Sequence, residues 1–443
     1  MFNEEEKKLG KWKEAIEETK IEPDKLEQAV MKGFQRAQNT KQVKRRPYVK
    51  RGVWSAIVAA ILLITLVTSI RVSPAFASAV ASIPGMEGIV ALIQDNKGLQ
   101  SAINNEHYQE IGVVGESSGV TVVVDGIIAD EMNIVLFYTI EYRQNHRSDF
   151  IERIQIKGAN GEELKWGSIS PNYADDYETS MVSTNSLEIS FQEPLSTKDI
   201  VVEFEIIGGY GETEIIKLPF TIEMDDAESQ RFTLNEEIVV EGQSMTIVDI
   251  VIGPVRTAIQ VQFNPDNTKE IYGFEDLQIV DEKGEVWSSI ENGVTASAND
   301  YEPDVVTYYL QSNYFEEAQK LFLQFNKIMA MDKSEAYILV DTEKQEILKQ
   351  PKDARFSNIS VIDNEMRMDF QDEKDFYSFP LMLDFLDNDD QLFEISSWSH
   401  GRNEEFASTI MLELPKEKYK NPIRFEIMGY PSYIQKSVEV KIK

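Results

Sequence analysis

Hydrophobic and polar residues alternate with a period of two over most of the chain after residue 107, and the same arrangement occurs three times. Each copy begins with a hairpin, whose second strand is predicted at Ile134–Tyr142, Thr257–Phe263 and Met366–Phe370. Successive side chains of a strand point to opposite faces, so the alternation predicts strands with one buried and one solvated face. The closing strands contain Val202, Phe204 and Ile206, then Leu321, Leu323 and Phe325, then Ile423, Phe425 and Ile427.

A polar turn and a tryptophan lie between these strands in every copy. The turns are Asn160-Gly161, Lys283-Gly284 and Asp389-Asp390, and the tryptophans are Trp166, Trp287 and Trp398. The repeat predicts a mainly β body of three tandem immunoglobulin-like β-sandwich modules, at residues 107–224, 230–343 and 352–443. We interpret the tryptophans as core residues, with a role as ligand platforms as the alternative.

Before residue 107 the apolar residues follow a helical period instead. Residues 71–106 are rich in Ala, Ile and Leu and are interrupted by Pro84, Gly85 and Gly98, which predicts a neck of two or three short helices. The neck either packs on the first module or lies on the outer surface of a membrane. Packing is the preferred interpretation.

Residues 1–40 predict two amphipathic helices that form a helical head. Their apolar faces carry Leu9, Trp12, Ile16, Leu26, Val30 and Phe34. About 40 residues bury too little surface for comfortable stability, so we expect these side chains to bind a cytoplasmic partner. An inert hairpin, or helices lying on the inner leaflet, is the alternative.

A membrane span is predicted between the head and the neck. Residues 53–70 are 18 residues without an ionisable group, close to the number that a helix needs to cross a bilayer. The polybasic segment 41–52 precedes them, and its charges are Lys41, Lys44, Arg45, Arg46, Lys50 and Arg51. This asymmetry predicts a cytoplasmic amino-terminal head and an extracellular body in a single-pass cell-membrane protein. A signal peptide cleaved after Ala77 is the alternative.

The charge distribution supports this division and excludes several functions. The 443 residues carry a net charge of −32, of which residues 1–52 contribute +5, leaving −37 for the rest. So acidic a body argues against direct binding of nucleic acid. The chain has no Cys and 3 His, which excludes thiolate metal sites and leaves little for a catalytic zinc. We therefore expect no enzyme activity, catalytic residue, metal or cofactor.

Two short motifs resemble chemical sites. Gly115–Gly119 (GESSG) has the spacing of a serine-hydrolase nucleophile elbow, but a strand is predicted after it where the elbow needs a helix, so we expect a hairpin turn. The acidic run at residues 384–390 offers oxygen atoms to calcium but lacks the spacing of a calcium loop. A solvated acidic turn is the preferred interpretation.

The region around the predicted span resembles a known family. Val72–Ala77 (VSPAFA), Ile83-Pro84-Gly85 and Asp95–Gln100 (DNKGLQ), after a basic stretch and one span, are similar to an uncharacterised family of Gram-positive membrane proteins. Its members are taken to be anti-sigma factors that pair with extracytoplasmic-function sigma factors. The resemblance covers roughly residues 24–142. It implies a cytoplasmic segment that binds a sigma factor, and it implies no particular site residues.

The sequence thus favours a signal-transducing membrane regulator of transcription. We expect the head to hold a sigma factor or another cytoplasmic protein while the extracellular body senses the state of the envelope through an unknown ligand. The alternative is a structural or adhesive cell-surface protein for which the head and span are only an anchor.

Overall fold

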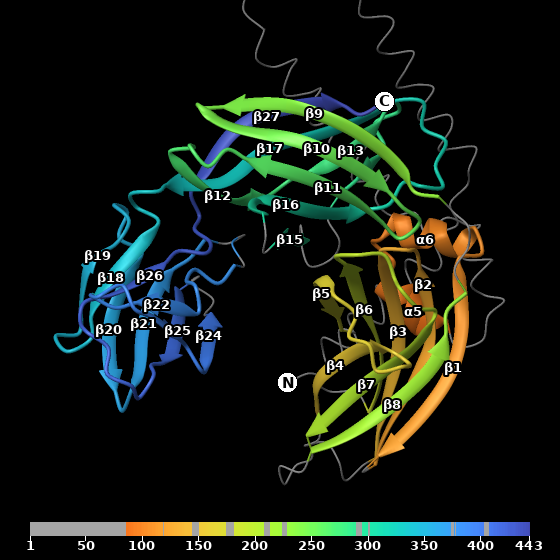
Figure 1. The fold of residues 1–443 in the computed structure, drawn as a ribbon, viewed down its shortest axis with the longest axis horizontal. Coiled ribbons are helices and arrows are strands. Elements are labelled where there is room, and N and C mark those ends of the chain that lie inside the picture. The colour runs from red at the N-terminus through yellow and green to blue at the C-terminus, as the bar shows by residue number, and fades with distance from the viewer. Residues whose placement is uncertain are drawn as a thin grey trace, which may run out of the picture. The chain divides into compact units, whose positions relative to one another are not determined.

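A computed structural model describes residues 86–443, with gaps at residues 118, 144–149, 174–180, 208–212, 224–227, 289–294, 300–301, 374–375, 377 and 403–406. The described part is mainly β, as the alternation predicts, with two short helices (Figure 1). Over these ranges no helix is long and apolar enough to cross a membrane. The head, the polybasic segment and the predicted span at residues 53–70 lie outside the described residues, and what the sequence predicts for them stays a prediction.

The first sandwich follows the two helices, α5 (Glu87–Leu92) and α6 (Lys97–Asn104). One sheet has the order β1-β2-β3-β6-β5 and the other β4-β7-β8, and facing apolar side chains of both form one core. Valine and isoleucine dominate this core because β-branched side chains suit a pleated surface. The strands are β1 (Tyr108–Ser117), β2 (Val120–Ala129), β3 (Asn133–Tyr142), β4 (Phe150–Gly158), β5 (Trp166–Asn172), β6 (Val182–Phe191), β7 (Asp199–Ile207) and β8 (Thr213–Thr221).

The second sandwich is built from a sheet of order β15-β16-β11-β10-β9 and a sheet of order β12-β17-β13-β14. A last strand, β27, pairs antiparallel with β17 along the second sheet (Figure 1). The strands are β9 (Gln230–Val240), β10 (Gln243–Ile252), β11 (Arg256–Phe263), β12 (Lys269–Phe274), β13 (Gln278–Asp281), β14 (Val286–Trp287), β15 (Thr295–Asn299), β16 (Glu302–Gln311), β17 (Leu321–Asp332) and β27 (Tyr433–Lys441).

The third sandwich lies between β17 and β27 in the chain. Its sheets have the orders β19-β18-β26-β22-β23 and β20-β21-β25-β24. Met329 and Met331 of β17 are buried in its core, so β17 contributes to the cores of two sandwiches. The strands are β18 (Tyr337–Asp341), β19 (Glu346–Lys349), β20 (Phe356–Ile362), β21 (Glu365–Gln371), β22 (Asp384–Leu386), β23 (Leu392–Glu394), β24 (Trp398–Arg402), β25 (Ala407–Glu413) and β26 (Ile423–Glu426).

The repeated strands that the alternation predicts are present. The hairpin strands are β3, β11 and β21, and the closing strands are β7, β17 and β26. Buried and less buried residues alternate over most of these strands, but β3 is buried on both faces over residues 133–138 because the neck helices cover the face that carries Val135 and Phe137. The interpretation of the tryptophans as core residues is correct for Trp287, which is 3% exposed, and wrong for Trp166 and Trp398, which are 52% and 49% exposed. Both exposed tryptophans begin edge strands, where Trp166 lies opposite the buried Phe191 and the Trp398 ring lies 4.8 Å from the Phe379 ring.

Both short motifs form turns. GESSG ends β1 and leads directly into β2, with Ser117 opposite Val120, so it is the expected hairpin turn. In the acidic run, the Asp387 carboxylate accepts hydrogen bonds from the backbone N–H groups of Asp389, Gln391 and Lys420. Burial favours the neutral acid, but these donors outweigh it and hold the pKa of Asp387 below its usual range. The Asp387 side chain therefore stabilises the turn by accepting hydrogen bonds from the backbone around it.

Candidate functional site

A buried ion pair joins the first two sandwiches. Arg256 opens β11 after a tight turn, in which the Gly253 N–H donates to the Arg256 carbonyl at 2.9 Å. Its guanidinium is 2% exposed and pairs with the Glu188 carboxylate of β6. The same guanidinium donates to Ser190 Oγ at 2.9 Å and lies 5.7 Å from the centroid of the Tyr309 ring. Charges are tolerated in such a place only when they are paired, so the two sandwiches depend on each other here.

The polar contacts continue from this ion pair to a buried aspartate of the first sandwich. Ser190 Oγ donates to Asn133 Oδ1 at 2.7 Å, and Asn133 Nδ2 donates to Asp130 Oδ1 at 2.9 Å. Asp130 Oδ2 then accepts the Val255 N–H of the second sandwich at 3.2 Å. Burial raises the pKa of Asp130, and its hydrogen bonds oppose that rise only in part. The network thus crosses between the sandwiches twice.

The neck helices pack where the first and second sandwiches meet, around the ion pair of Arg256 and Glu188. We call this region the junction. Residues of both helices share a hydrophobic cluster with Val135 and Phe137 of the first sandwich and with Val255 of the second. At α6 the backbone of the second sandwich approaches so closely that a Cβ on Gly98 would lie 2.6 Å from the Ser312 nitrogen. No side chain fits there without displacing one of the two segments. Gly98 is therefore explained by this close approach, which outweighs its poor helix propensity.

Hydrogen bonds at the start of α6 reinforce the packing. Asn96 caps the helix by accepting the Leu99 N–H at 3.1 Å. Gln311 of β16 accepts the Lys97 N–H and donates to the Asp95 carbonyl, both at 3.1 Å. The end of β16 therefore holds the first turn of α6, and the neck is attached to the second sandwich as well as to the first.

Two cavities lie on either side of the ion pair. The smaller, about 220 Å³, is lined by neck residues together with Glu188 and Gln311. The larger, about 800 Å³, is a cleft between the first two sandwiches, with Arg256 and Trp166 among its lining residues. Glu188 thus faces the cavity beside the neck while its partner faces the cleft. The ion pair between Glu188 and Arg256 therefore lies between the two cavities.

The floor of the cleft is the outer face of one sheet of the second sandwich. Its residues stand side by side in register, with Ala258 opposite Val251 on one side and Tyr309 on the other. The first sandwich forms the opposite wall, where β5 runs close to β15. A Cβ on Gly167 would lie 3.3 Å from Ser297 Oγ, so a small residue there permits the approach.

Charged side chains of the cleft are mostly paired with one another. Lys165 contacts Glu193 at 3.0 Å, and Arg231 contacts Asp249 at 2.6 Å. Two buried polar atoms in the cleft lining, Arg256 Nε and Asp249 Oδ1, have no hydrogen-bond partner among the described residues. Both atoms are buried beneath the surface of the cleft.

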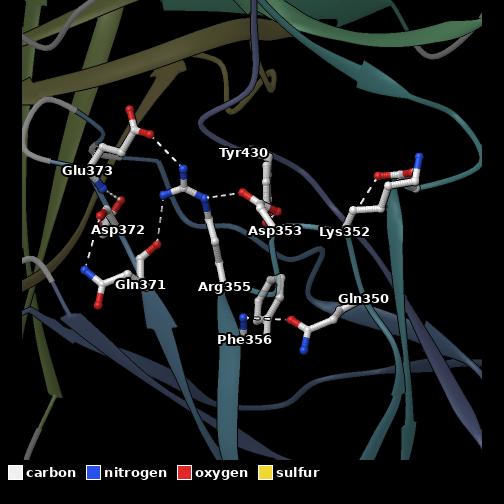
Figure 2. A network of polar contacts seen from close by, with 10 residues as sticks. Gln350, Lys352, Asp353, Arg355, Phe356, Gln371, Asp372, Glu373 and Tyr430 are labelled. Atoms are coloured by element: carbon white, nitrogen blue, oxygen red, sulfur yellow. Dashed lines mark hydrogen bonds and ion pairs between the residues drawn. The ribbon is translucent and has the colours of Figure 1, made fainter.

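A second polar network closes one end of the third sandwich (Figure 2). Arg355, just before β20, pairs with Asp353 at 2.6 Å and Glu373 at 2.7 Å and donates to the Gln371 carbonyl at 3.2 Å. Tyr430 donates to Asp353 at 2.5 Å, while its ring packs among the core phenylalanines. Burial and the neighbouring carboxylate raise the pKa of Tyr430. These polar groups are paired with one another, so this end of the third sandwich needs no ligand to satisfy them.

The sequence does not predict the contact between the first two sandwiches. Its partner-binding and membrane-flanking residues all lie outside the described residues, and among the described residues there is no cluster able to hold a metal ion. No local signal marks Glu188, because it alternates with the core residues Leu187 and Ile189 and therefore takes the position of a side chain on the opposite face of β6. Its partner is 68 residues away in sequence, so only the fold brings the two together.

Two family models match parts of the chain. Residues 48–142 are similar to a domain of unknown function (DUF4179). Residues 229–351, which span β9 to β19, are similar to a family of unknown function (DUF5643). None of the curated proteins compared with the chain matches it.

Two solved structures are distantly similar to the chain. A conserved domain protein from Bacillus anthracis has 17% identity and a TM-score of 0.38, with 55% of this chain and 84% of that chain covered. A marsupial T cell receptor has 8% identity and a TM-score of 0.14, with 72% and 99% covered. At these scores neither likeness assigns a fold or a function.

Proposed function

We propose that the protein is a single-pass membrane regulator, an anti-sigma factor that holds a cytoplasmic sigma factor through its head and senses the envelope through three tandem immunoglobulin-like modules outside the cell. The observation that carries this proposal is the attachment of the neck. Helix α6 contacts both the first sandwich and Ser312 of the second. The neck follows the predicted span in sequence, so a change at the junction has a short covalent route to the membrane.

The match of residues 48–142 to a domain that occurs in anti-sigma-factor-like proteins supports the same proposal. This stretch contains part of the polybasic segment, the predicted span, the neck and the first hairpin. In a regulator of this kind these parts act together, because the span must link an outer sensor to an inner partner. A purely adhesive protein places no such requirement on the neck.

The head is proposed to bind its partner through its apolar faces. Trp12, Ile16 and Phe34 lie on one side of their predicted helices, and each large apolar side chain recovers roughly 1.5–3 kcal/mol when a partner buries it fully. The polybasic segment instead faces the lipid headgroups and fixes the orientation of the span.

The test is capture of a co-transcribed sigma factor by the full chain in membrane extracts. Trp12→Asp with Phe34→Asp is expected to release the sigma factor and switch on its regulon. The control is Lys7→Gln with Gln35→Asp, which makes the same change in net charge on the opposite sides of the predicted helices. Equal capture by both variants rejects the apolar faces as the binding surface, and no capture even by the wild type favours the structural or adhesive alternative.

Topology needs its own test, because the whole proposal depends on it. Reporter fusions after residue 50 and after residue 110 are expected to report the cytoplasm and the exterior respectively. The reverse result rejects the regulator with an external sensor.

A further inference from the structure

We propose that the cleft between the first two sandwiches binds a neutral oligosaccharide, with the Trp166 indole stacked against the apolar face of one sugar ring. The proposal deepens the proposed function, since it names the class of ligand that the outer body would sense. Binding itself is independent of any sigma factor. The cleft volume of about 800 Å³ lies within the range of 300–1,000 Å³ that is usual for ligand sites.

Trp166 is the first observation that favours a ligand. It is 52% exposed and lies in the lining of the cleft, in surroundings that are mainly polar. The exposed Trp166 indole leaves a large apolar face in water, and a ligand bound in the cleft would cover that face. A sugar ring suits it, because one side of the ring presents C–H groups while the rim presents hydroxyl groups.

Charge selects a neutral ligand. The lining contains three cationic side chains, Lys165, Arg231 and Arg256, and three anionic ones, Glu163, Glu193 and Asp249. The charges of the cleft therefore cancel, whereas residues 53–443 as a whole carry −37. An anionic ligand would be repelled by the body, and a cationic ligand would bind acidic surface everywhere without preference for the cleft.

The hydrogen-bonding groups of the cleft suit hydroxyl groups. Each sugar hydroxyl donates and accepts, and the cleft lining offers both kinds of group, including the side-chain amides of Gln192 and Gln260 and the hydroxyl of Ser297. A hydroxyl group that pairs with them replaces the hydrogen bonds that it made with water. The ion pairs of the lining hold their charged groups in place, which reduces the entropy lost on binding.

The shape of the floor argues against an extended peptide. Peptides commonly bind a sheet by adding a strand to its open edge, where the backbone groups are unpaired. The cleft floor is a sheet face instead, and its central strands are paired on both sides. Small side chains such as Ala258 and Ser297 leave room on that face for a sugar ring that lies parallel to the sheet.

Ligand in the cleft would also contact the junction. Arg256 lines the cleft and is paired with Glu188, which lines the cavity beside the neck. A ligand that covers Arg256 therefore changes the surroundings of a contact shared with the neck side. This gives the ligand a direct route to the segment that precedes the body.

The experiment screens the purified full chain, in detergent, against an array of neutral glycans, anionic glycans and peptides, and then measures affinity for the best neutral glycan by calorimetry. Trp166→Ala is expected to weaken binding at least about tenfold, which is about 1.4 kcal/mol. The matched control is Trp398→Ala, because Trp398 is 49% exposed at the equivalent position of the third sandwich. Its affinity is expected to equal that of the wild type.

Three results overturn the proposal: binding of no neutral glycan by the wild type, binding of peptides or anionic glycans alone, or equal affinity of Trp166→Ala and wild type. Thermal unfolding of each variant shows whether it is folded. Capture of the sigma factor is measured on the same preparations. Glycan binding without sigma capture rejects the proposed regulator and supports the glycan site. Sigma capture without glycan binding supports the regulator and rejects the glycan site.

Discussion

Arg256 of the second sandwich and Glu188 of the first form an ion pair in which 2% and 9% of the two side chains are exposed. Removing two charges from water is costly, and their attraction repays that cost only while both partners are present. The junction is consequently sensitive to the loss of either residue. It is less sensitive to the loss of both.

Arg256→Met is expected to destabilise the first two sandwiches by about 3–5 kcal/mol, because it leaves Glu188 buried without a counter-charge. The double variant Arg256→Met with Glu188→Leu should recover much of that loss. Calorimetric unfolding of the four proteins in the cycle measures the coupling. As a control, Lys165→Ala breaks an exposed pair and should cost no more than about 1 kcal/mol. Additive losses from Arg256→Met and Glu188→Leu would contradict this account.

Gly98→Ala is expected to loosen the neck although alanine favours a helix by about 1 kcal/mol over glycine. The new Cβ would lie 2.6 Å from the Ser312 nitrogen, so α6 must move away from the second sandwich. Hydrogen exchange at residues 99–103 should become faster. Gly401→Ala is the control, since its Cβ would meet no atom within 4 Å. Slower exchange in α6 of Gly98→Ala would show that propensity wins over packing.

Ile434→Ala in β27 is expected to destabilise the second sandwich by about 2–5 kcal/mol, although the third sandwich lies immediately before it in sequence. Ile434 is 2% exposed and belongs to the core of the second sandwich. Hydrogen exchange should therefore increase in β10 and β11 more than in β21 and β25. Lys436→Ala, an exposed position of the same strand, serves as the control. Preferential loss of protection in β21 would refute the assignment of Ile434 to the second core.

Acid is expected to weaken the first sandwich through Glu203. Hydrogen bonds from Lys157 and Lys217, at 2.8 and 2.5 Å, lower the pKa of Glu203 below its usual value. A carboxylate with a lowered pKa stabilises the fold above the pKa of the unfolded chain, about 4.3, and this stabilisation is lost as pH falls through the folded pKa.

Glu203→Gln should therefore cost up to about 1 kcal/mol at pH 7 and depend less on pH between about 5 and 3. Urea unfolding across that pH range measures both effects. Glu152→Gln, an exposed position of the neighbouring strand β4, is the control for a general change in net charge. An unchanged pH dependence in Glu203→Gln would show that Glu203 contributes nothing to acid sensitivity.

Local alternation predicted strands well because it reports which side of a strand is buried. It placed β11 and β21 to within a residue, since Ile259 and Met368 alternate with polar neighbours. It could not say which strand pairs with which, so the pairing of β27 with β17 was missed. It also assigned Trp166 to a core, because hydrophobicity does not distinguish a core residue from one exposed in a cleft. The sites predicted in the head stay predictions.

The pairing of β27 with β17 has a consequence for biosynthesis. A ribosome makes β17 first, then the whole third sandwich, and only afterwards the strand that covers Phe322 to Met329 of β17. Until then one edge of β17 lacks its neighbour, and unpaired edges invite association between nascent chains. The second sandwich is thus finished after the third has been synthesised. A premature stop between residues 337 and 432 would therefore leave the second sandwich without β27, although every other strand of that sandwich had already been made.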